Sequence, residues 1–325
     1  MQAPLLEVRQ LKKHFPIKGG LLGKTVARVH AVDDVSFSLQ HGETLGLVGE
    51  SGCGKSTLGR SILRLYEPTA GQITFDGVDL LSLNPKAMRH KRRDMQIIFQ
   101  DPFSSLNPRM TIGQVLAEPF IIHKLGTRSE IENNVRKLLE TVGLPADAES
   151  RFPHEFSGGQ RQRVGIARAI ALNPKLIVAD EPVSALDVSI QSQILNLLVD
   201  LRKKFKLSYL FVAHDLAVIE HISDKVAVMY LGKIVEYSTS EALYARPSHP
   251  YTKALIAAIP VPDLSAKKER QVLTGDVPSP INPPSGCYFH PRCPHATDRC
   301  KTEAPQLRDI GAPGKSHLVS CHYAD

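Results

Sequence analysis

The chain has 325 residues, which is enough for about two domains, and its 42% hydrophobic and 22% charged residues are typical of a globular protein. The formal charge of +7 comes from scattered Lys and Arg, which favours a solvated basic face over a nucleic-acid partner. No apolar run approaches the ~18 residues of a membrane-spanning helix, and no signal-peptide pattern opens the chain. We therefore expect a cytosolic protein.

The first 43 residues have the apolar pattern of β structure, interrupted by a Gly/Lys-rich stretch from Lys18 to Lys24 that we expect to be a surface loop. Phe15 is either a core residue or an aromatic that stacks on a nucleobase. The apolar run Thr44 to Val48 predicts a buried strand, and Leu58 to Leu65 predicts a helix.

A phosphate-binding loop stands between that strand and that helix. The sequence Gly-Glu-Ser-Gly-Cys-Gly-Lys-Ser-Thr fits G-x-x-x-x-G-K-[ST], and its glycines let successive N–H groups converge on a phosphate. Lys55 is expected to bridge the β- and γ-phosphates, and Ser56 to ligate Mg²⁺ with support from Thr57. The loop predicts a nucleoside triphosphate as the ligand, and the candidate binding residues are Gly49, Glu50, Ser51, Gly52, Cys53, Gly54, Lys55, Ser56 and Thr57.

In the middle of the chain, the pattern changes from short strands to turns and helical periodicity. Short strands are predicted at Gln72–Gly77 and Met95–Phe99, and Gln100 ends the second of them. Residues 102–160 then carry turns and a helical periodicity that is clearest from Ile131 to Val142. This pattern predicts an inserted helical subdomain.

Strands alternating with helices resume after the insertion. Helices are predicted at about Gln160–Leu172 and Ile190–Lys204, strands at Leu176–Ala179 and Tyr209–Ala213, and a hairpin at Val226–Val235. The alternation predicts an α/β fold with a mostly parallel sheet and ligands at the carboxyl ends of its strands. The residues at such ends are Gly49, Gln100, Asp180 and His214.

Two further segments carry candidate catalytic and anion-binding residues. Asp180, after an apolar strand, is expected to hold Mg²⁺ through its water shell, and Glu181 to polarise the attacking water as a general base. Capping of the following helix is the alternative for this pair. Ser157-Gly158-Gly159-Gln160 opens another helix whose N–H groups can bind an anion, and one nucleotide does not explain two such sites.

Ser-Gly-Gly-Gln closely resembles the signature motif of ABC ATPases, which contacts the γ-phosphate bound to the opposite subunit. The phosphate loop, Gln100, Asp180-Glu181, Ser184-Ala185-Leu186-Asp187 and His214 also occur in that family's order, over about residues 5 to 245. The resemblance implies a RecA-like core, an antiparallel β subdomain and a helical subdomain of about residues 102–160.

The same resemblance implies roles for single residues. Gln100 would be the Q-loop residue that links Mg²⁺ and water to a membrane partner, Asp187 would belong to the dimer-crossing D-loop, and His214 would contact the γ-phosphate. Phe156 replaces the leucine that is frequent before the signature serine, and Phe15 lies farther from the phosphate loop than the adenine-stacking aromatic of the family does.

Beyond residue 245 the composition becomes proline-rich, which predicts a small module at 246–325 after a cassette at 1–245. Arg246 to Leu255 and the Pro-rich run before Cys287 look like the C-terminal region of dipeptide and oligopeptide importer ATPases. The chain looks most like the F-type ATP-binding subunit of bacterial dipeptide importers. Importers of nickel or glutathione are close alternatives, and a soluble ABC ATPase of translation or DNA repair is the rival class.

The resemblance implies an ATPase that powers uptake of dipeptides or oligopeptides from the cytoplasmic face of the bacterial inner membrane. It also implies partners: a second and different ATP-binding subunit, two transmembrane permease subunits and an extracytoplasmic peptide-binding protein. No nucleic acid is expected.

Four of the five cysteines lie in the last forty residues, at Cys287, Cys293, Cys300 and Cys321. Such clustering in a cytosolic protein favours a metal over disulfides, and a bound metal would stabilise a small, loop-rich module. The spacing lacks the C-x₂-C knuckles of zinc ribbons, and four thiolates also suit an iron–sulfur cluster. The resembled importers imply a [4Fe-4S] cluster, while zinc and free thiols are the alternatives.

Overall fold

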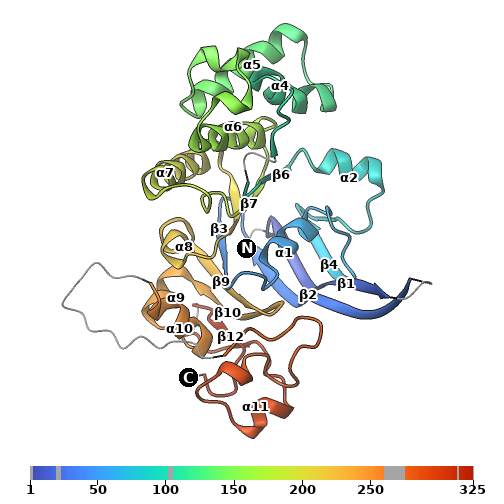
Figure 1. Cartoon of the computed structure of the whole chain (residues 1–325), viewed down its shortest axis with the longest axis vertical. Helices are drawn as coiled ribbons and strands as arrows, with labels where there is room; N and C mark the ends of the chain where they lie inside the picture. The colour runs from blue at the N-terminus through green and yellow to red at the C-terminus, as the bar shows by residue number, and fades with distance from the viewer. Residues whose placement is uncertain (1–2, 20–22, 102–104, 260–274, 313–314, 325) are drawn as a thin grey trace, which may run out of the picture. The chain divides into compact units, whose positions relative to one another are not determined.

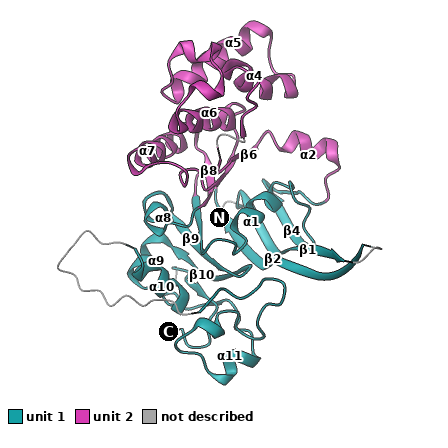
Figure 2. Cartoon of the chain, viewed as in Figure 1, with its two compact units in different colours: residues 1–40, 44–81, 213–325 teal, residues 41–43, 82–212 magenta. Residues whose placement is uncertain are grey.

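The computed structural model describes residues 3–19, 23–101, 105–259, 275–312 and 315–324 (Figure 1). The chain divides into two compact units: residues 1–40, 44–81 and 213–325 form unit 1, and residues 41–43 and 82–212 form unit 2 (Figure 2). Within the described ranges, no helix is both long and apolar enough to cross a lipid bilayer.

Unit 1 contains an antiparallel sheet of four strands in the order β2-β1-β4-β5. Their bounds are β1 Leu6–Gly19, β2 Lys24–Leu39, β4 Ala70–Phe75 and β5 Val78–Asp79. The prediction of a surface loop from Lys18 to Lys24 is wrong at both ends, because Lys18 pairs with Thr25 and Gly19 pairs with Lys24. Glycine at 19 leaves room for the side chain of Val26 across the pair, which lets the strands continue. The middle of that predicted loop, residues 20–22, lies outside the described residues.

A second group of strands in unit 1 carries the phosphate loop. Strand β3 (Thr44–Val48) is buried along its whole length and pairs in parallel with β9 (Lys225–Tyr230). Strand β9 turns at Leu231-Gly232, both with positive φ, into β10 (Lys233–Thr239), which confirms the predicted hairpin. The chain returns to this group through β12 (Leu318–Val319), which pairs with β10 and with β11 (Arg308–Asp309).

The helices of unit 1 are short. Helix α1 follows the phosphate loop, and it begins at Lys55 rather than at Leu58 because Gly54 is already its N-cap. The helices of this unit are α1 Lys55–Ile62, α8 Leu216–Ile222, α9 Ser240–Ala245, α10 Pro250–Ala257 and α11 Asp298–Thr302, with a 3₁₀ turn η3 at His290–Arg292.

Unit 2 is built around three parallel strands, β6 (Met95–Ile98), β7 (Leu176–Asp180) and β8 (Ser208–Val212), with β7 between the other two. Every residue of β7 and β8 is buried, as their nearly continuous apolar sequences predict for parallel strands covered on both faces. The strand and helix assignments made for this region are confirmed within a few residues at each end.

The helical insertion expected after Gln100 is present in unit 2. Helix α5 begins at Arg128, three residues before the predicted start, because its first turn is polar and is recognised by the Thr127–Glu130 capping box rather than by apolar periodicity. The helices of unit 2 are α2 Pro85–Lys91, α4 Ile112–His123, α5 Arg128–Thr141, α6 Gly158–Ile170 and α7 Val188–Phe205, with 3₁₀ turns η1 at Ala146–Ser150 and η2 at Pro153–Glu155.

Candidate functional site

The phosphate loop has the backbone that its glycines were expected to allow. Gly49, Gly52 and Gly54 all have positive φ, at 154°, 79° and 106°. A Cβ at Gly49 would lie 2.1 Å from the Met229 carbonyl oxygen, and one at Gly54 would lie 1.9 Å from that of Ala31. Side chains are therefore excluded at these two positions by neighbouring backbone, in addition to the need for close approach to a phosphate.

Lys55 lies at the centre of this loop with only 4% of its surface exposed. Its ammonium donates to the carbonyl oxygens of Gly49, at 2.7 Å, and Glu50, at 3.0 Å, so the charge is held against the loop that would surround a phosphate chain. Cys53 is buried beside it, and burial raises the pKa of this thiol despite the nearby ammonium. Cys53 is thus a buried, protonated thiol that packs inside the loop.

Phe15 lies on β1 and is half-buried. Its ring meets the ring of Tyr66 edge to face, with centroids 5.4 Å apart, and the Lys13 ammonium lies 4.7 Å from the Phe15 centroid. Tyr66 and Lys13 therefore both pack against this ring. Both sequence interpretations of Phe15, core residue and base-stacking aromatic, are compatible with a half-buried ring.

In unit 2 the structure brings Gln100 and Glu181 together. Strands β6 and β7 are parallel neighbours, so the residues just beyond their carboxyl ends meet, and the Gln100 amide donates to the Glu181 carboxylate at 3.2 Å. Asp180, the last residue of β7, is 1% exposed. Two carboxylates and a side-chain amide therefore collect at one edge of the sheet, and Mg²⁺ prefers oxygen ligands of the kind that these groups carry.

The predicted signature segment forms the start of α6. Ser157 is the N-cap: its hydroxyl accepts from the Gln160 N–H at 3.3 Å, and the Gln160 side chain accepts from the Ser157 N–H at 3.0 Å. Gly159 is buried, and a Cβ there would lie 2.6 Å from Ile190 Cγ2 on α7. The motif thus has a capping role and a packing role in this chain, and Ser157 itself is exposed.

The remaining two predicted residues also precede helices. Asp187 in unit 2 is the N-cap of α7 and accepts from the Ile190 N–H at 3.0 Å. His214 in unit 1 is exposed and stands one residue before Asp215, the N-cap of α8. The site residues are thus divided between the units, with the phosphate loop, Phe15 and His214 in unit 1 and the other catalytic candidates in unit 2.

The C-terminal region contacts the phosphate loop directly within unit 1. The Arg292 guanidinium donates to both oxygens of the Glu50 carboxylate, at 2.6 and 3.0 Å, and hydrogen bonding to Glu50 raises the pKa of Arg292. The Glu50 N–H donates to the Tyr251 hydroxyl oxygen at 2.9 Å. The second residue of the loop is therefore fixed at its backbone and at its side chain by residues about 200 or more positions away.

A buried carboxylate anchors this region. Glu236 on β10 has no exposed surface and accepts from the N–H groups of Ser248 and His249, at 2.8 and 2.9 Å, and pairs with His317 Nε2 at 2.7 Å. Burial opposes its ionisation, but its hydrogen bonds, the one to His317 above all, outweigh burial and lower the pKa of Glu236. A charge-assisted network therefore joins β10, the start of α10 and the last strand.

The four C-terminal cysteines line one cavity of about 320 Å³ in unit 1. None of these four cysteines forms a disulfide, and they come from the segment around η3, from α11 and from the chain end. Burial raises the pKa of Cys287 to about 11, and the three other cysteines nearby contribute in the same direction. The other lining side chains include Phe289, His290, His295, His322 and Tyr323.

Sequence reasoning missed two of the residues that build this site. Tyr251 lies in the Arg246 to Leu255 stretch and Arg292 lies between two cysteines of the cluster; neither had a predicted role, although both hold Glu50. The available signal is the placement of Arg292 one residue before Cys293, inside the cysteine cluster. That placement indicates a role near the cysteines and does not indicate contact with a loop 242 residues earlier.

The fold and the motifs of these two units define an ABC-type ATPase. Residues 32–184 match the ABC transporter family, and residues 235–300 match the C-terminal region of oligopeptide/dipeptide transporters. Among solved structures, the ATP-binding cassette MJ0796, in a dimeric post-hydrolysis state bound to ADP and Pi, has a TM-score of 0.65 and 27% identity, covering 72% of this chain and 98% of that one. CbiO1 from Clostridium perfringens, part of a CbiONQ transporter complex, has a TM-score of 0.64 and 26% identity, covering 75% and 92%.

Curated relatives extend over the whole chain. A putative peptide import ATP-binding protein of Brucella ovis is 58% identical over 98% of both chains. The oligopeptide transport ATP-binding protein AppF of Bacillus subtilis is 55% identical over 99% of this chain and 98% of its own. The chain therefore belongs to the ABC transporter family, within the group of peptide import ATP-binding proteins. It is an ATP-hydrolysing subunit that uses Mg-ATP, dimerises and works with membrane permeases.

Proposed function

We propose that this chain powers the uptake of dipeptides or oligopeptides, with Glu181 as the general base of its own hydrolytic site. The 3.2 Å hydrogen bond between Gln100 and Glu181 carries the catalytic part of this proposal, because it orients a carboxylate at the edge of the sheet beside the buried Asp180. Identity of 58% to a peptide import protein over nearly the full chain supports the peptide class. Nickel and glutathione are the alternative solutes.

The mechanism follows from the chemistry of phosphoryl transfer. The N–H groups of Gly49 to Thr57 and the Lys55 ammonium would hold the β- and γ-phosphates, while Ser56, Asp180 and Gln100 would be the oxygen ligands for Mg²⁺. Glu181 would polarise the attacking water, and His214 would contact the γ-phosphate. Lys55, Mg²⁺ and His214 would stabilise the charge that develops on the transferring phosphoryl group.

The second half of each hydrolytic site would come from a partner. Ser157 is exposed at the start of α6, where helix N–H groups favour an anion, and Asp187 stands at the start of α7. We infer that the Ser157 to Gln160 segment closes on ATP held by a second and different ATP-binding subunit. The remaining parts of the assembly are two permeases and an extracytoplasmic peptide-binding protein, and the chain would act at the cytoplasmic face of the inner membrane.

We further propose a [4Fe-4S] cluster as the occupant of the cysteine cavity. A single tetrahedral zinc would hold four sulfurs about 3.8 Å apart, at Zn–S bonds of about 2.3 Å. The described cysteines form no group of three ligand atoms within 4.8 Å of one another, although all four line one cavity of about 320 Å³. This wider spacing fits a polynuclear cluster better than one zinc ion. The cassette at 1–245 would thus be followed by a metal-stabilised module at 246–325.

The test is anaerobic purification of this chain from detergent-solubilised membranes of its host. Two multi-span subunits, a second ATPase and a broad visible iron–sulfur band are the expected result. Peptide-stimulated ATPase activity of that complex in proteoliposomes checks the solute class. Recovery with ribosomes or DNA and without membrane subunits would contradict the transport proposal, and zinc with no visible band would contradict the cluster.

A further inference from the structure

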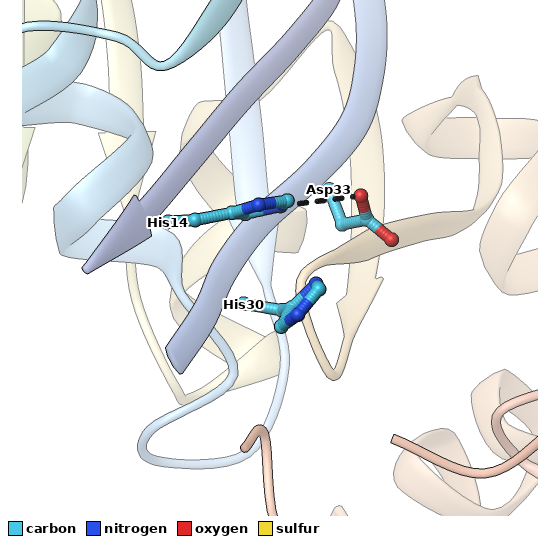
Figure 3. Close-up of side chains that lie close together, drawn as sticks. All are labelled: His14, His30 and Asp33. Atoms are coloured by element: carbon cyan, nitrogen blue, oxygen red, sulfur yellow. Dashed lines mark ion pairs between the residues drawn. The ribbon is translucent and has the colours of Figure 1, made fainter. Parts of the chain in front are cut away.

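Two histidines and an aspartate converge in unit 1, and none of the three lines the cysteine cavity (Figure 3). His14 on β1 is the direct cross-strand partner of His30 on β2, and their ring centroids are 4.1 Å apart. His14 Nε2 lies 3.4 Å from Asp33 Oδ1, and ligand-capable atoms of all three residues lie within 4.8 Å of one another. Among the described parts of the chain, this is the one such group of three or more His, Cys, Asp or Glu residues.

A bulge in β2 makes this convergence possible. His14 pairs with His30 but Lys13 pairs with Val32, so Ala31 is an extra residue on the β2 side. In a regular strand His30 and Asp33, three positions apart, would face opposite sides of the sheet. The extra residue shifts the alternation by one, which brings both side chains to His14. Bulges of this kind commonly aim a side chain at a site.

The polar atoms in this group are incompletely satisfied. His14 Nε2 and His30 Nδ1 are both buried atoms without a hydrogen bond of acceptable geometry. Only 13% of the His14 side chain and 12% of the Asp33 side chain are exposed. A buried imidazole nitrogen that lacks a partner costs free energy, and coordination of a cation by that nitrogen would remove the cost.

Neighbouring side chains orient the Asp33 carboxylate so that one of its oxygens faces His14. Its Oδ2 accepts from Tyr288 at 3.1 Å and pairs with the Lys233 ammonium at 3.2 Å, while Oδ1 faces His14. Partners of this kind, which occupy one carboxylate oxygen and orient the other, are found behind many metal ligands. Burial opposes ionisation of Asp33, but Lys233, Tyr288 and His14 outweigh it and lower its pKa.

We propose that His14, His30 and Asp33 bind a divalent transition-metal ion of the zinc class, with water as the fourth ligand. At bonds of about 2.0 Å, two ligand atoms of a tetrahedral ion lie about 3.3 Å apart, close to the observed 3.4 Å between His14 and Asp33. Two imidazoles and one carboxylate are a common donor set for zinc and its neighbours in the first row. The ion would join β1 to β2 and, through Asp33, to Tyr288 of the C-terminal region.

The test counts metal equivalents on the full-length chain. After anaerobic treatment with EDTA and removal of the chelator, the wild type, His30→Gln and His14→Asn are dialysed against micromolar zinc and their bound zinc is measured. We expect each variant to lose one equivalent relative to the wild type. His221→Asn, an exposed histidine on α8 in the same unit, is the matched control and should lose none.

Cobalt distinguishes this site from the cysteine cavity. In the wild type, the cobalt ion that the variants fail to bind should show visible d–d bands without the intense near-ultraviolet absorption of a cobalt thiolate. The thiolate absorption of cobalt in the cysteine cavity should be the same in the wild type and the variants. Circular dichroism and melting in EDTA establish that each variant is folded. Equal zinc stoichiometry in folded wild type and His30→Gln would overturn the proposal, as would loss of thiolate absorption alone, and either result would leave only an ion pair or a bridging water between these residues.

Discussion

Glu181 has φ of +48°, a left-handed conformation that is uncommon outside glycine. Its N–H donates to the Val212 carbonyl at 3.0 Å, which fixes this conformation directly after β7. The side chain is thereby aimed at Gln100. Strained backbone at a residue with proposed catalytic chemistry is a common association, and here it explains why Asp180 and Glu181 have different surroundings.

We expect Glu181→Gln to lower kcat of the assembled complex by about 10²- to 10⁴-fold, because a neutral amide no longer polarises the attacking water. ATP binding should be retained, since the phosphate loop is untouched. Phosphate release and nucleotide binding measured on one preparation check both statements. Glu140→Gln, at an exposed position on α5, is the control, and unchanged turnover in the Glu181 variant would refute the assignment.

His249 predicts a pH dependence of stability. Burial lowers its pKa from 6.5 to about 4; Glu236 opposes this shift and Lys253 adds to it. Between pH 6.5 and about pH 4, the His249 imidazole is protonated in the unfolded chain but neutral in the folded chain. Stability therefore falls as the pH is lowered through this window, by about 3 kcal/mol as an order of magnitude.

Urea unfolding between about pH 7 and about pH 5 measures the larger part of this loss, about 2 kcal/mol, in a range above that in which Glu236 titrates. His249→Asn should reduce the slope, because Asn can still accept from the Tyr251 N–H as the His249 ring does at 3.1 Å but does not titrate. An unaltered slope in a folded Asn variant would mean that other groups control acid stability.

In helix α6, a glycine of the signature segment also determines how the helix packs against α7. Gly158 and Gly159 follow the Ser157 cap, and the structure leaves no room for a side chain at Gly159 because Ile190 of α7 lies there. A Cβ at Gly165, farther along the same helix, meets no heavy atom within 4 Å among the residues that the structure describes. Gly159 and Gly165 are therefore constrained differently.

We expect Gly159→Ala to destabilise the protein by about 1–3 kcal/mol through overpacking against Ile190. Gly165→Ala should stabilise it by about 0.5–1 kcal/mol, since alanine is the better helix former. Chemical denaturation of both variants, and of Gly159→Ala combined with Ile190→Ala as a rescue, measures the difference. Equal effects of the two alanines would show that α6 and α7 separate at little cost.

Within unit 1, the phosphate loop and the C-terminal region depend on one another. Arg292 is 7% exposed and forms a bidentate pair with Glu50, while the Arg292 guanidinium also lies 5.9 Å from the centre of the Tyr230 ring. Tyr230, Tyr251 and Phe289 form an aromatic cluster with centroids 4.8 to 5.4 Å apart. The cysteine-bearing segment thus packs against the residues that hold the loop.

We expect Arg292→Met to lower the unfolding free energy by about 1–3 kcal/mol, because it leaves a partly buried Glu50 carboxylate unpaired. ATP affinity should fall with it, since Glu50 belongs to the loop. A double-mutant cycle with Glu50→Gln should give a coupling of about 0.5–3 kcal/mol. Arg299→Met, which breaks an exposed pair with Glu303, is the control and should change neither quantity measurably.

The sequence by itself determined the chemistry that lies in short contiguous segments. The phosphate loop, Asp180-Glu181 and the start of α6 are recognisable because their residues are neighbours in the chain and their spacing follows local backbone geometry. Parallel strands are predictable from apolar runs, and the rule that ligands bind at their carboxyl ends selected Gln100 and Asp180. That Gln100 donates to Glu181 is known only from the structure. The expected loop from Lys18 to Lys24 is wrong at its ends because strand pairing overrides the glycines there.

Only the tertiary structure decided the contacts between distant residues. The pairing of Glu50 with Arg292 spans 242 positions, and no local periodicity predicts it. The meeting of His14, His30 and Asp33 depends on a bulge at Ala31, which is a property of two paired strands rather than of either sequence. Side-chain direction across a sheet is set by register, and register is fixed by the packing of the whole unit.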